Sequence, residues 1–168
     1  MLHDGNGWTV DHEGHRHWGR FGAAGLLVVD RRGPGRPSVL LQHRARWTAD
    51  GGTWGIPGGA RDSHEDVVAA ALREAYEETE VPATAVRVAG DPFVDDRGGW
   101  SYTTVLAELV HDVELVVEAE SEALAWVVVE EVDRLHLHPG FALTWPLLRA
   151  RLEGGAGVPE DGTGDAER

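Results

Sequence analysis

Short apolar runs separated by turn-rich clusters predict β-strands along most of the chain. The run FGAAGLLVVD at 21–30 is short enough for one buried strand, and VLLQHR at 39–44 indicates a second. The cluster RRGPGRPS lies between the two runs, so they are expected to form a hairpin with a long loop. Later apolar runs predict further strands over 85–91, 101–110 and 123–129.

A central helix is predicted over residues 66–80, which contain strong helix formers and neither Gly nor Pro. Asp62 or Ser63 is the candidate cap at its start, and Pro82 follows its end. The segment before it, residues 45–65, is rich in Gly and Pro and is expected to be a loop.

The last part of the chain predicts a short helix over 130–135 and a terminal helix over 140–153. Pro146 is expected either to kink the terminal helix or to begin it, with Thr144 as the cap in the second case. Mixed strands with one central and one late helix predict an α+β protein built as α/β/α layers.

A chain of 168 residues fits one domain with a sizeable core. The expected organisation is an N-terminal segment over 1–19, one domain over 20–153, and a flexible Gly-rich tail over 154–168. The first twenty residues lack the pattern of a signal peptide, and no apolar run approaches the roughly 18 residues of a membrane helix. A cytoplasmic location without membrane attachment is therefore expected.

The charge balance narrows the function classes. Asp and Glu number 29 against 15 cationic residues, which are all Arg, so the formal net charge is −14. Such an acidic chain is expected to repel nucleic acid polymers, whose binding depends on neutralised phosphates. A small anionic substrate can still bind together with divalent cations. The absence of Lys and Cys excludes lysine Schiff bases, disulfides, thiolate metal sites and cysteine nucleophiles.

Three carboxylates share one face of the predicted central helix. At roughly 100° per residue, Glu74, Glu77 and Glu78 fall within an arc of about 100°, away from the apolar stripe. Like charges at this spacing repel by a few tenths of a kcal/mol per pair. Two interpretations remain open from the helix alone. The face is a solvated acidic surface, or its oxygens hold hard cations such as Mg²⁺ or Mn²⁺.

The loop before the helix favours the second interpretation. Loop and helix together read Gly59-x5-Glu65-x7-Arg73-Glu74-Ala75-x-Glu77-Glu78-x-Glu80-Val81, which resembles the Nudix box, G-x5-E-x7-R-E-U-x-E-E-x-G-U with U a bulky aliphatic residue. The stretch WGIPGG at 54–59 also resembles the segment that precedes this box in many members. Two positions depart from the pattern, because Glu80 replaces the last Gly and Ala75 is small for a U position. The resemblance covers residues 20–150.

The resemblance implies a Nudix-type α/β/α sandwich with a mixed sheet and a hydrolase in which water attacks a diphosphate bridge with the help of divalent metals. The cofactor it implies is Mg²⁺, with Mn²⁺ as a substitute. Glu74 is the first choice for the base that removes the proton from water, and Glu120 is the second. The glycines let the backbone approach metal and phosphate closely. The residues implied to ligate the metal are the carbonyl of Gly58 and the carboxylates of Glu74, Glu77, Glu78 and Glu120.

Further residues carry roles by resemblance, each beside a plainer alternative. Arg73 orients its neighbours, or it pairs only with Glu77 one turn away. Glu65 matches the first glutamate of the box, or it is an ordinary first-turn helix residue. Glu120 lies six residues before Trp126, where MutT-like members place a loop glutamate at the metal site; the alternative is an exposed acidic loop.

Substrate contacts are expected from four residues. Arg44 resembles the position where MutT-like enzymes contact a substrate phosphate, and the alternative is a surface arginine. Gly59 is expected to approach the phosphates, and Trp47 and Phe141, with Trp54 and Trp100 as further candidates, offer surfaces for stacking on a base.

Two composition features limit these assignments. MutT-like enzymes often read an oxidised guanine with an Asn, but Phe141 stands at that position here. The only Asn in the chain is Asn6, so backbone groups or an Asp, Gln or Arg side chain must read the edge of the base. The histidines at 12, 15 and 17 and at 136 and 138 are expected to be solvated polar residues and not zinc ligands, because Cys is absent.

The sequence therefore predicts a MutT-like Nudix hydrolase acting on a nucleoside di- or triphosphate, with oxidised nucleotides such as 8-oxo-dGTP included. ADP-ribose or a diadenosine polyphosphate is the alternative substrate within the same chemistry. A nucleotide-binding regulator with little turnover, or an acidic interaction module, is the alternative of another class. The expected partner is a small nucleotide, and neither a nucleic acid polymer nor a membrane. Base, cleaved bond, metal number and oligomeric state stay open.

Overall fold

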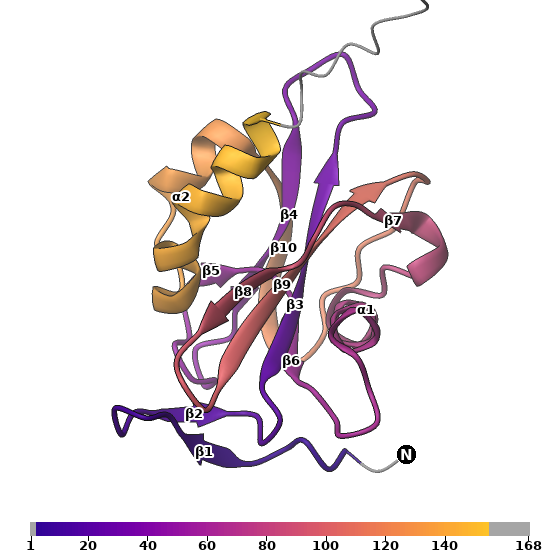
Figure 1. The fold of residues 1–168 in the computed structure, drawn as a ribbon. Helices are drawn as coiled ribbons and strands as arrows, with labels where there is room; N and C mark the ends of the chain where they lie inside the picture. Colours follow the sequence, from indigo (N-terminus) through magenta and orange to yellow (C-terminus); the bar gives the residue numbers. More distant parts are fainter. Residues whose placement is uncertain (1–2, 155–168) are drawn as a thin grey trace, which may run out of the picture.

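A mixed β-sheet forms the centre of the computed structural model, which describes residues 3–154 (Figure 1). Its main strands lie in the order β10, β4, β3, β9, β7, while β5 pairs with β4, β6 with β3 and β8 with β9. Strands β3 and β9 are parallel, and the other neighbours in the sheet are antiparallel. The strands are β3 (Ala23–Asp30), β4 (Ser38–Arg44), β5 (Trp54–Gly55), β6 (Gly58–Ala60), β7 (Val86–Val88), β8 (Phe93–Asp96), β9 (Ser101–Leu109) and β10 (Ser121–Val128).

One helix covers each face of this sheet. Helix α1 (Val67–Thr79) lies on one face and α2 (Pro139–Gly154) on the other, as Figure 1 shows. Alternate residues of β3 pack in opposite directions, with Leu26 in the core beneath α1 and Leu27 in the core beneath α2. The predicted α+β class and α/β/α layering are confirmed. Two short 3₁₀ helices follow α1 and β10, namely η1 (Ala83–Ala85) and η2 (Val129–Arg134).

Both ends of α1 are fixed by local contacts. The cap is Asp66, whose side chain accepts a hydrogen bond from the backbone N–H of Ala69 at 2.8 Å, so the prediction of Asp62 or Ser63 is wrong. The helix ends at Glu80, which adopts the left-handed conformation at φ 59°. Glu80 therefore takes the backbone conformation that Gly usually supplies at a helix end, at a steric cost of about 1–2 kcal/mol.

Several predicted elements differ in extent. The expected loop over 45–65 contains β5 and β6, which are only two and three residues long and too short to leave a periodic pattern. The strand predicted over 85–91 is reduced to β7, and β8 was missed because it is only four residues long, with two apolar residues followed by two acidic ones beside a glycine turn. The remaining predicted strands and the hairpin of β3 and β4 are confirmed.

Pro146 lies inside α2, which begins at Pro139. The alternative in which Pro146 starts the helix is therefore wrong. The hydroxyl of Thr144 donates within the helix, toward the carbonyl oxygens of Gly140 and Phe141 at 3.4 and 3.3 Å, and does not cap it. The helix start is held instead by His138, whose Nδ1 accepts from the N–H of Gly140 at 3.1 Å.

The first twenty residues contain structure that the sequence did not predict. Strands β1 (Trp8–Val10) and β2 (Arg16–Trp18) form a separate antiparallel hairpin at one end of the main sheet (Figure 1). The predicted domain boundaries stay a prediction, and the tail predicted from residue 154 onward lies outside the described residues except for Gly154, which ends α2. Within residues 3–154, no helix has both the length and the hydropathy that crossing a bilayer requires.

Candidate active site

Glu78 is a buried carboxylate that joins α1 to β6. Its side chain accepts a hydrogen bond from the backbone N–H of Gly58 at 2.8 Å, and the residue is only 8% exposed. Burial, together with the nearby charge of Glu74, raises the pKa of Glu78 to about 8. The fold therefore holds an acidic group where an anion is strongly disfavoured unless a cation accompanies it.

Glu74 lies beside the same strand. Its side chain is mostly buried, and burial raises the pKa of Glu74 while the adjacent Arg73 opposes the rise. A side chain at Gly59 would place its Cβ only 2.5 Å from Oε2 of Glu74. Because Gly59 has no side chain, the carboxylate of Glu74 can approach the backbone of β6 closely.

Gly58 has no room for a side chain either. A Cβ there would collide with the hydroxyl of Tyr102 and would lie 2.6 Å from the Cα of Gly25 in β3. Burial raises the pKa of Tyr102, and the charges of Glu78 and Glu74 act in the same direction. The phenol, the glycine backbone and the two carboxylates therefore form one contiguous group between β9, β6 and α1.

Arg73 binds the box glutamates together. Its guanidinium donates to Glu65 at 2.6 and 2.9 Å, to the carbonyl oxygen of Ala60 at 3.0 Å and to Glu74 at 2.7 Å. The contact with Glu77 is longer, at 3.3 Å. The pairing with Glu77 is real, but the shorter bonds go to Glu65 and Glu74, as expected for an arginine that orients its neighbours.

Glu65 precedes α1 and does not belong to its first turn, so the interpretation of Glu65 as an ordinary first-turn residue is wrong. Its carboxylate accepts from the backbone N–H of Asp62 at 3.1 Å as well as from Arg73. These hydrogen bonds, above all the one from Arg73, lower the pKa of Glu65. Glu65 is thereby kept ionised and fixed, which suits a residue that holds Arg73 in place.

Glu77 and Glu120 lie at the solvent side of the group. The side chain of Glu77 is 46% exposed, and Glu120 is exposed in the turn before β10, where its carbonyl oxygen accepts from the N–H of Ala45 at 2.9 Å. The charge of Glu120 nevertheless contributes to the raised pKa of Glu74. Within residues 3–154, no three of the four predicted carboxylate ligands have oxygens within 4.8 Å of one another. The turn thus brings Glu120 toward Glu74 without a preformed cage.

The donor set fits a hard divalent cation. Glu74 and Glu78 are mostly buried, carry like charges and offer only oxygen atoms, a combination that suits Mg²⁺ or Mn²⁺ better than zinc. Among the N-terminal histidines, His15 and His17 both point their rings at the carboxylate of Asp11. In the described part of the chain, the group with closely spaced His and carboxylate atoms is instead Asp4, Asp62 and His64.

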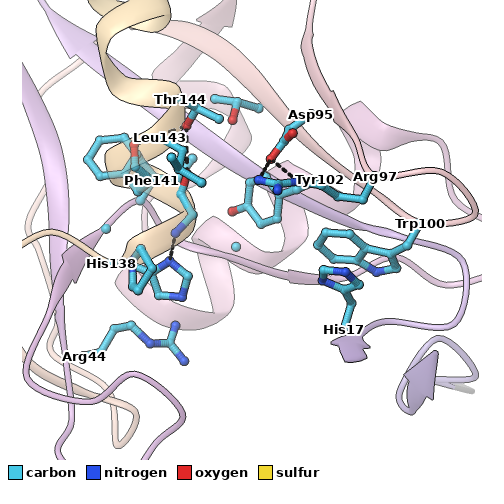
Figure 2. A pocket seen from close by; sticks show the side chains of 16 residues that line it. His17, Arg44, Asp95, Arg97, Trp100, Tyr102, His138, Phe141, Leu143 and Thr144 are labelled. Carbon is cyan, nitrogen blue, oxygen red and sulfur yellow. Dashed lines mark hydrogen bonds and ion pairs between the residues drawn. The ribbon is translucent and has the colours of Figure 1, made fainter. Parts of the chain in front are cut away.

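A cavity of about 310 Å³ opens beside this group (Figure 2). Gly58 belongs to its lining, so the backbone that bonds Glu78 also faces the cavity. The start of α2 lines one side and the turn between β8 and β9 lines the other. The size and the mixture of apolar surface with a few polar groups are typical of a site for a small molecule.

The predicted substrate residues are distributed unevenly around this cavity. Arg44 and Phe141 belong to its lining, and Phe141 also packs on Trp145 at 5.5 Å between ring centroids. Arg44 donates from Nε to the carbonyl oxygen of Ala49 at 3.0 Å. Gly59 contacts the carboxylate side, whereas Trp47 is 70% exposed and is absent from the lining. The structure therefore does not bring Trp47 to the cavity that Arg44 and Phe141 line.

Sequence reasoning missed a set of residues on the far wall of the cavity. Trp100 was a stacking candidate, but Asp95 and Arg97 were not singled out, and His17 was weighed only as a zinc ligand and not as a residue of the substrate site. Their signal is weak because β8 was not predicted and the hairpin sequence reads only as a polar segment. The glycine pair at 98 and 99 could have marked the tight turn that presents them.

Comparison with known proteins gives a consistent family. The family model described as the NUDIX domain matches residues 19–148. "Putative 8-oxo-dGTP diphosphatase 3" of Mycobacterium tuberculosis is 51% identical over 155 residues, which cover 87% of this chain and 70% of that protein. A "Nucleoside triphosphate pyrophosphatase/Nudix hydrolase fusion protein" of Bifidobacterium longum is 41% identical over 89% of this chain and 32% of its own length.

Solved structures agree with the sequence comparison. The crystal structure of the Nudix hydrolase RenU of M. smegmatis superposes with a TM-score of 0.84 and 42% identity, covering 93% of this chain and 99% of that one. The Ap4A hydrolase of C. elegans, in a binary complex, gives a TM-score of 0.66 at 22% identity, covering 79% of this chain and 98% of that one. The first is close in sequence and fold, and the second shows the shared fold alone.

Proposed function

This chain belongs to the Nudix family and is a Nudix hydrolase, and on that basis we propose that it cleaves the diphosphate linkage of a nucleoside di- or triphosphate, with 8-oxo-dGTP as the first substrate to test. The observation that carries the proposal is the position of Gly58. Its N–H bonds the buried Glu78 on one side, and the residue lines the cavity on the other. A nucleoside in the cavity would therefore have its phosphates directed toward the carboxylates of α1.

We propose Mg²⁺ as the cofactor, with Mn²⁺ able to replace it, because Nudix enzymes generally use divalent cations and the donors here are oxygens. When bound, such ions neutralise charge on the diphosphate oxygens and acidify water. The proposed ligands are the carbonyl of Gly58 and the carboxylates of Glu74, Glu77, Glu78 and Glu120.

Glu74 is the proposed general base. Its burial raises its pKa, so it is a better proton acceptor than an exposed glutamate, and Arg73 holds it in place through a 2.7 Å hydrogen bond. Glu65 fixes Arg73 from the other side with two bonds. Glu120 is the second candidate for the base, since it is exposed in a turn that approaches Glu74.

Arg44 is proposed to bind a phosphate of the substrate, and Phe141 to contact the base. Arg44 uses only Nε for a hydrogen bond within residues 3–154, which leaves its terminal nitrogens available at the cavity. The proposed role of Trp47 in stacking has less support, because it is exposed away from the lining. The name of the M. tuberculosis relative supports an oxidised guanine nucleotide, and Asp95 and Arg97 at the cavity offer polar groups for the edge of its base.

A nucleotide panel with product identification by mass tests the proposal. The panel contains 8-oxo-dGTP, the four common deoxynucleoside triphosphates, ADP-ribose and diadenosine tetraphosphate, each with Mg²⁺, Mn²⁺ or chelator. We expect metal-dependent release of pyrophosphate or phosphate from the triphosphates, lost in Glu74→Gln and kept in Glu80→Gln, which alters an exposed carboxylate at the end of α1. Preferred cleavage of ADP-ribose or diadenosine tetraphosphate would replace the substrate class. Binding without turnover would favour a regulator.

A further inference from the structure

The β1–β2 hairpin lies outside the segment matched by the family model, yet it is fitted closely to the turn between β8 and β9. The N–H of His12 donates to the carbonyl oxygen of Gly98 at 2.8 Å, and Nε1 of Trp100 donates to the carbonyl oxygen of Gly19 at 3.1 Å. Gly98 has a φ of 72°, and a Cβ there would lie 2.8 Å from the ring of His12. The glycine turn is thus shaped to receive the hairpin.

The same hairpin contributes a ring to the cavity. His17, from β2, stacks on Trp100 with 4.1 Å between ring centroids and 9° between ring planes, and both residues line the cavity. Figure 2 shows the two rings parallel on one side of the cavity, with His138 and Phe141 across from them. One side of the cavity therefore depends on a residue that the family model does not include.

A buried carboxylate holds His17 in this position. Asp11 is 7% exposed, and its Oδ2 lies 2.8 Å from Nε2 of His17. Its Oδ1 accepts from the backbone N–H groups of Glu13 and His15, both at 2.9 Å. The hydrogen bond with His17 is the main reason that the pKa of Asp11 is lowered. A fully satisfied carboxylate of this kind fixes the orientation of the imidazole ring.

The polar part of the same wall is built by a neighbouring ion pair. Nε and Nη2 of Arg97 both donate to Oδ2 of Asp95, at 3.0 and 2.7 Å. No hydrogen bond within residues 3–154 uses Oδ1 of Asp95 or Nη1 of Arg97. We call His17, Trp100, Asp95 and Arg97 the hairpin wall. It offers a stacked aromatic pair beside one available acceptor and one available donor, which is the chemistry that a nucleobase with a polar edge requires.

We propose that the β1–β2 hairpin completes the substrate cavity and that the hairpin wall binds the base of the nucleotide. Asp11 is the positioning residue, and His17 with Trp100 determines affinity for the base. The inference rests on the proposed function, because it takes the ligand to be a nucleotide. Because one acceptor and one donor can match the edge of every common base, the wall recognises a base without by itself selecting an oxidised one.

The test compares His17→Ala with His15→Ala. Both imidazoles face Asp11, but the side chain of His15 is 67% exposed and does not line the cavity, so it is a matched control. In His17→Ala we expect KM for the preferred nucleoside triphosphate to rise about tenfold, the range for loss of an aromatic contact with a base, with kcat within twofold of the unchanged chain. His17→Phe, which can keep the stack on Trp100, should restore most of the affinity.

Inorganic triphosphate, which has no base, separates base binding from general damage to the site. As a competitive inhibitor it should keep its inhibition constant in His17→Ala. An equal loss of affinity for inorganic triphosphate, or an unchanged KM for the nucleotide, would overturn the inference. If no nucleotide is hydrolysed, the proposed function fails separately. The inference is then decided by calorimetry with α,β-methylene dGTP, where equal affinity in His17→Ala and His15→Ala refutes it.

Discussion

Replacing Glu78 by Gln is expected to stabilise the metal-free protein at alkaline pH while abolishing its activity. Glu78 is 8% exposed, so its ionised form is poorly solvated even though its carboxylate accepts a hydrogen bond from the N–H of Gly58. Its pKa is raised from the ordinary 4.5 to about 8 by burial and by Glu74. At about 1.4 kcal/mol per pH unit, this difference sets a ceiling of about 5 kcal/mol on the cost of the charge.

The sign of the pH dependence follows from proton binding. Between pH 4.5 and 8 the folded chain holds the proton of Glu78 more tightly than the unfolded chain does. The contribution of Glu78 to the free energy of unfolding therefore falls as pH rises through this window and levels off above pH 8. Glutamine carries no charge, so the Glu78→Gln variant should gain on the unchanged chain progressively over the same window.

Urea unfolding at pH 5, 6.5 and 8, with chelator present, measures this difference. The unfolding free energy of Glu78→Gln minus that of the unchanged chain should be small at pH 5 and reach a few kcal/mol at pH 8. Because the two proteins share every histidine, their difference removes the titration of the histidines. Glu77→Gln, at a half-exposed neighbouring carboxylate, is the control for the loss of one negative charge from the same helix. Equal slopes for Glu78→Gln and the unchanged chain would refute the reasoning.

Three further outcomes are expected. Glu74→Gln should lower kcat by about 100-fold or more with unchanged circular dichroism, and a near-normal rate would remove Glu74 as the base. Gly59→Ala places a Cβ 2.5 Å from Oε2 of Glu74, so steady-state kinetics should show a kcat about tenfold lower. Its unfolding free energy should change by less than about 1 kcal/mol, because the carboxylate at the end of the Glu74 side chain can move away from the new methyl group. Glu80→Gly should raise the unfolding free energy by about 1 kcal/mol in urea titrations and leave the rate unchanged, because φ is 59° there; a destabilised variant would contradict this.

The sequence predicts the elements whose patterns are long and regular. Residues 66–80 and 101–110 read correctly because each buries a continuous face against the sheet. The box spacing also predicts that Glu74 and Glu78 share a face of α1. It does not show that Glu78 is buried, because Glu78 is buried by packing against Gly58, which belongs to β6 and not to α1. Local pattern therefore locates the carboxylates, and only tertiary packing determines which of them is desolvated.

The far wall of the cavity could not be predicted for a related reason. His17 and Trp100 are 83 positions apart and meet only because a three-residue strand pairing and a glycine turn align two distant segments of the chain. Neither segment carries a periodic apolar pattern. His17 is fixed by a hydrogen bond to one buried carboxylate, Asp11, which in the sequence is indistinguishable from the other acidic residues, and Trp100 is fixed by a hydrogen bond to the carbonyl oxygen of Gly19.

The two positions that depart from the box, Glu80 and Ala75, have different structural requirements from the glycines Gly58 and Gly59. At Glu80 the requirement is a left-handed backbone at the helix end, which a glutamate can meet at modest cost. At Ala75 the requirement is packing, and the residue is fully buried against the sheet. At Gly58 and Gly59 the space for a Cβ is already occupied by Tyr102 and Glu74. Substitution is tolerated where another residue can adopt the same backbone or fill the same core. We expect it not to be tolerated where the carboxylates contact the main chain, and this chain departs from the pattern while keeping glycine at both of those positions.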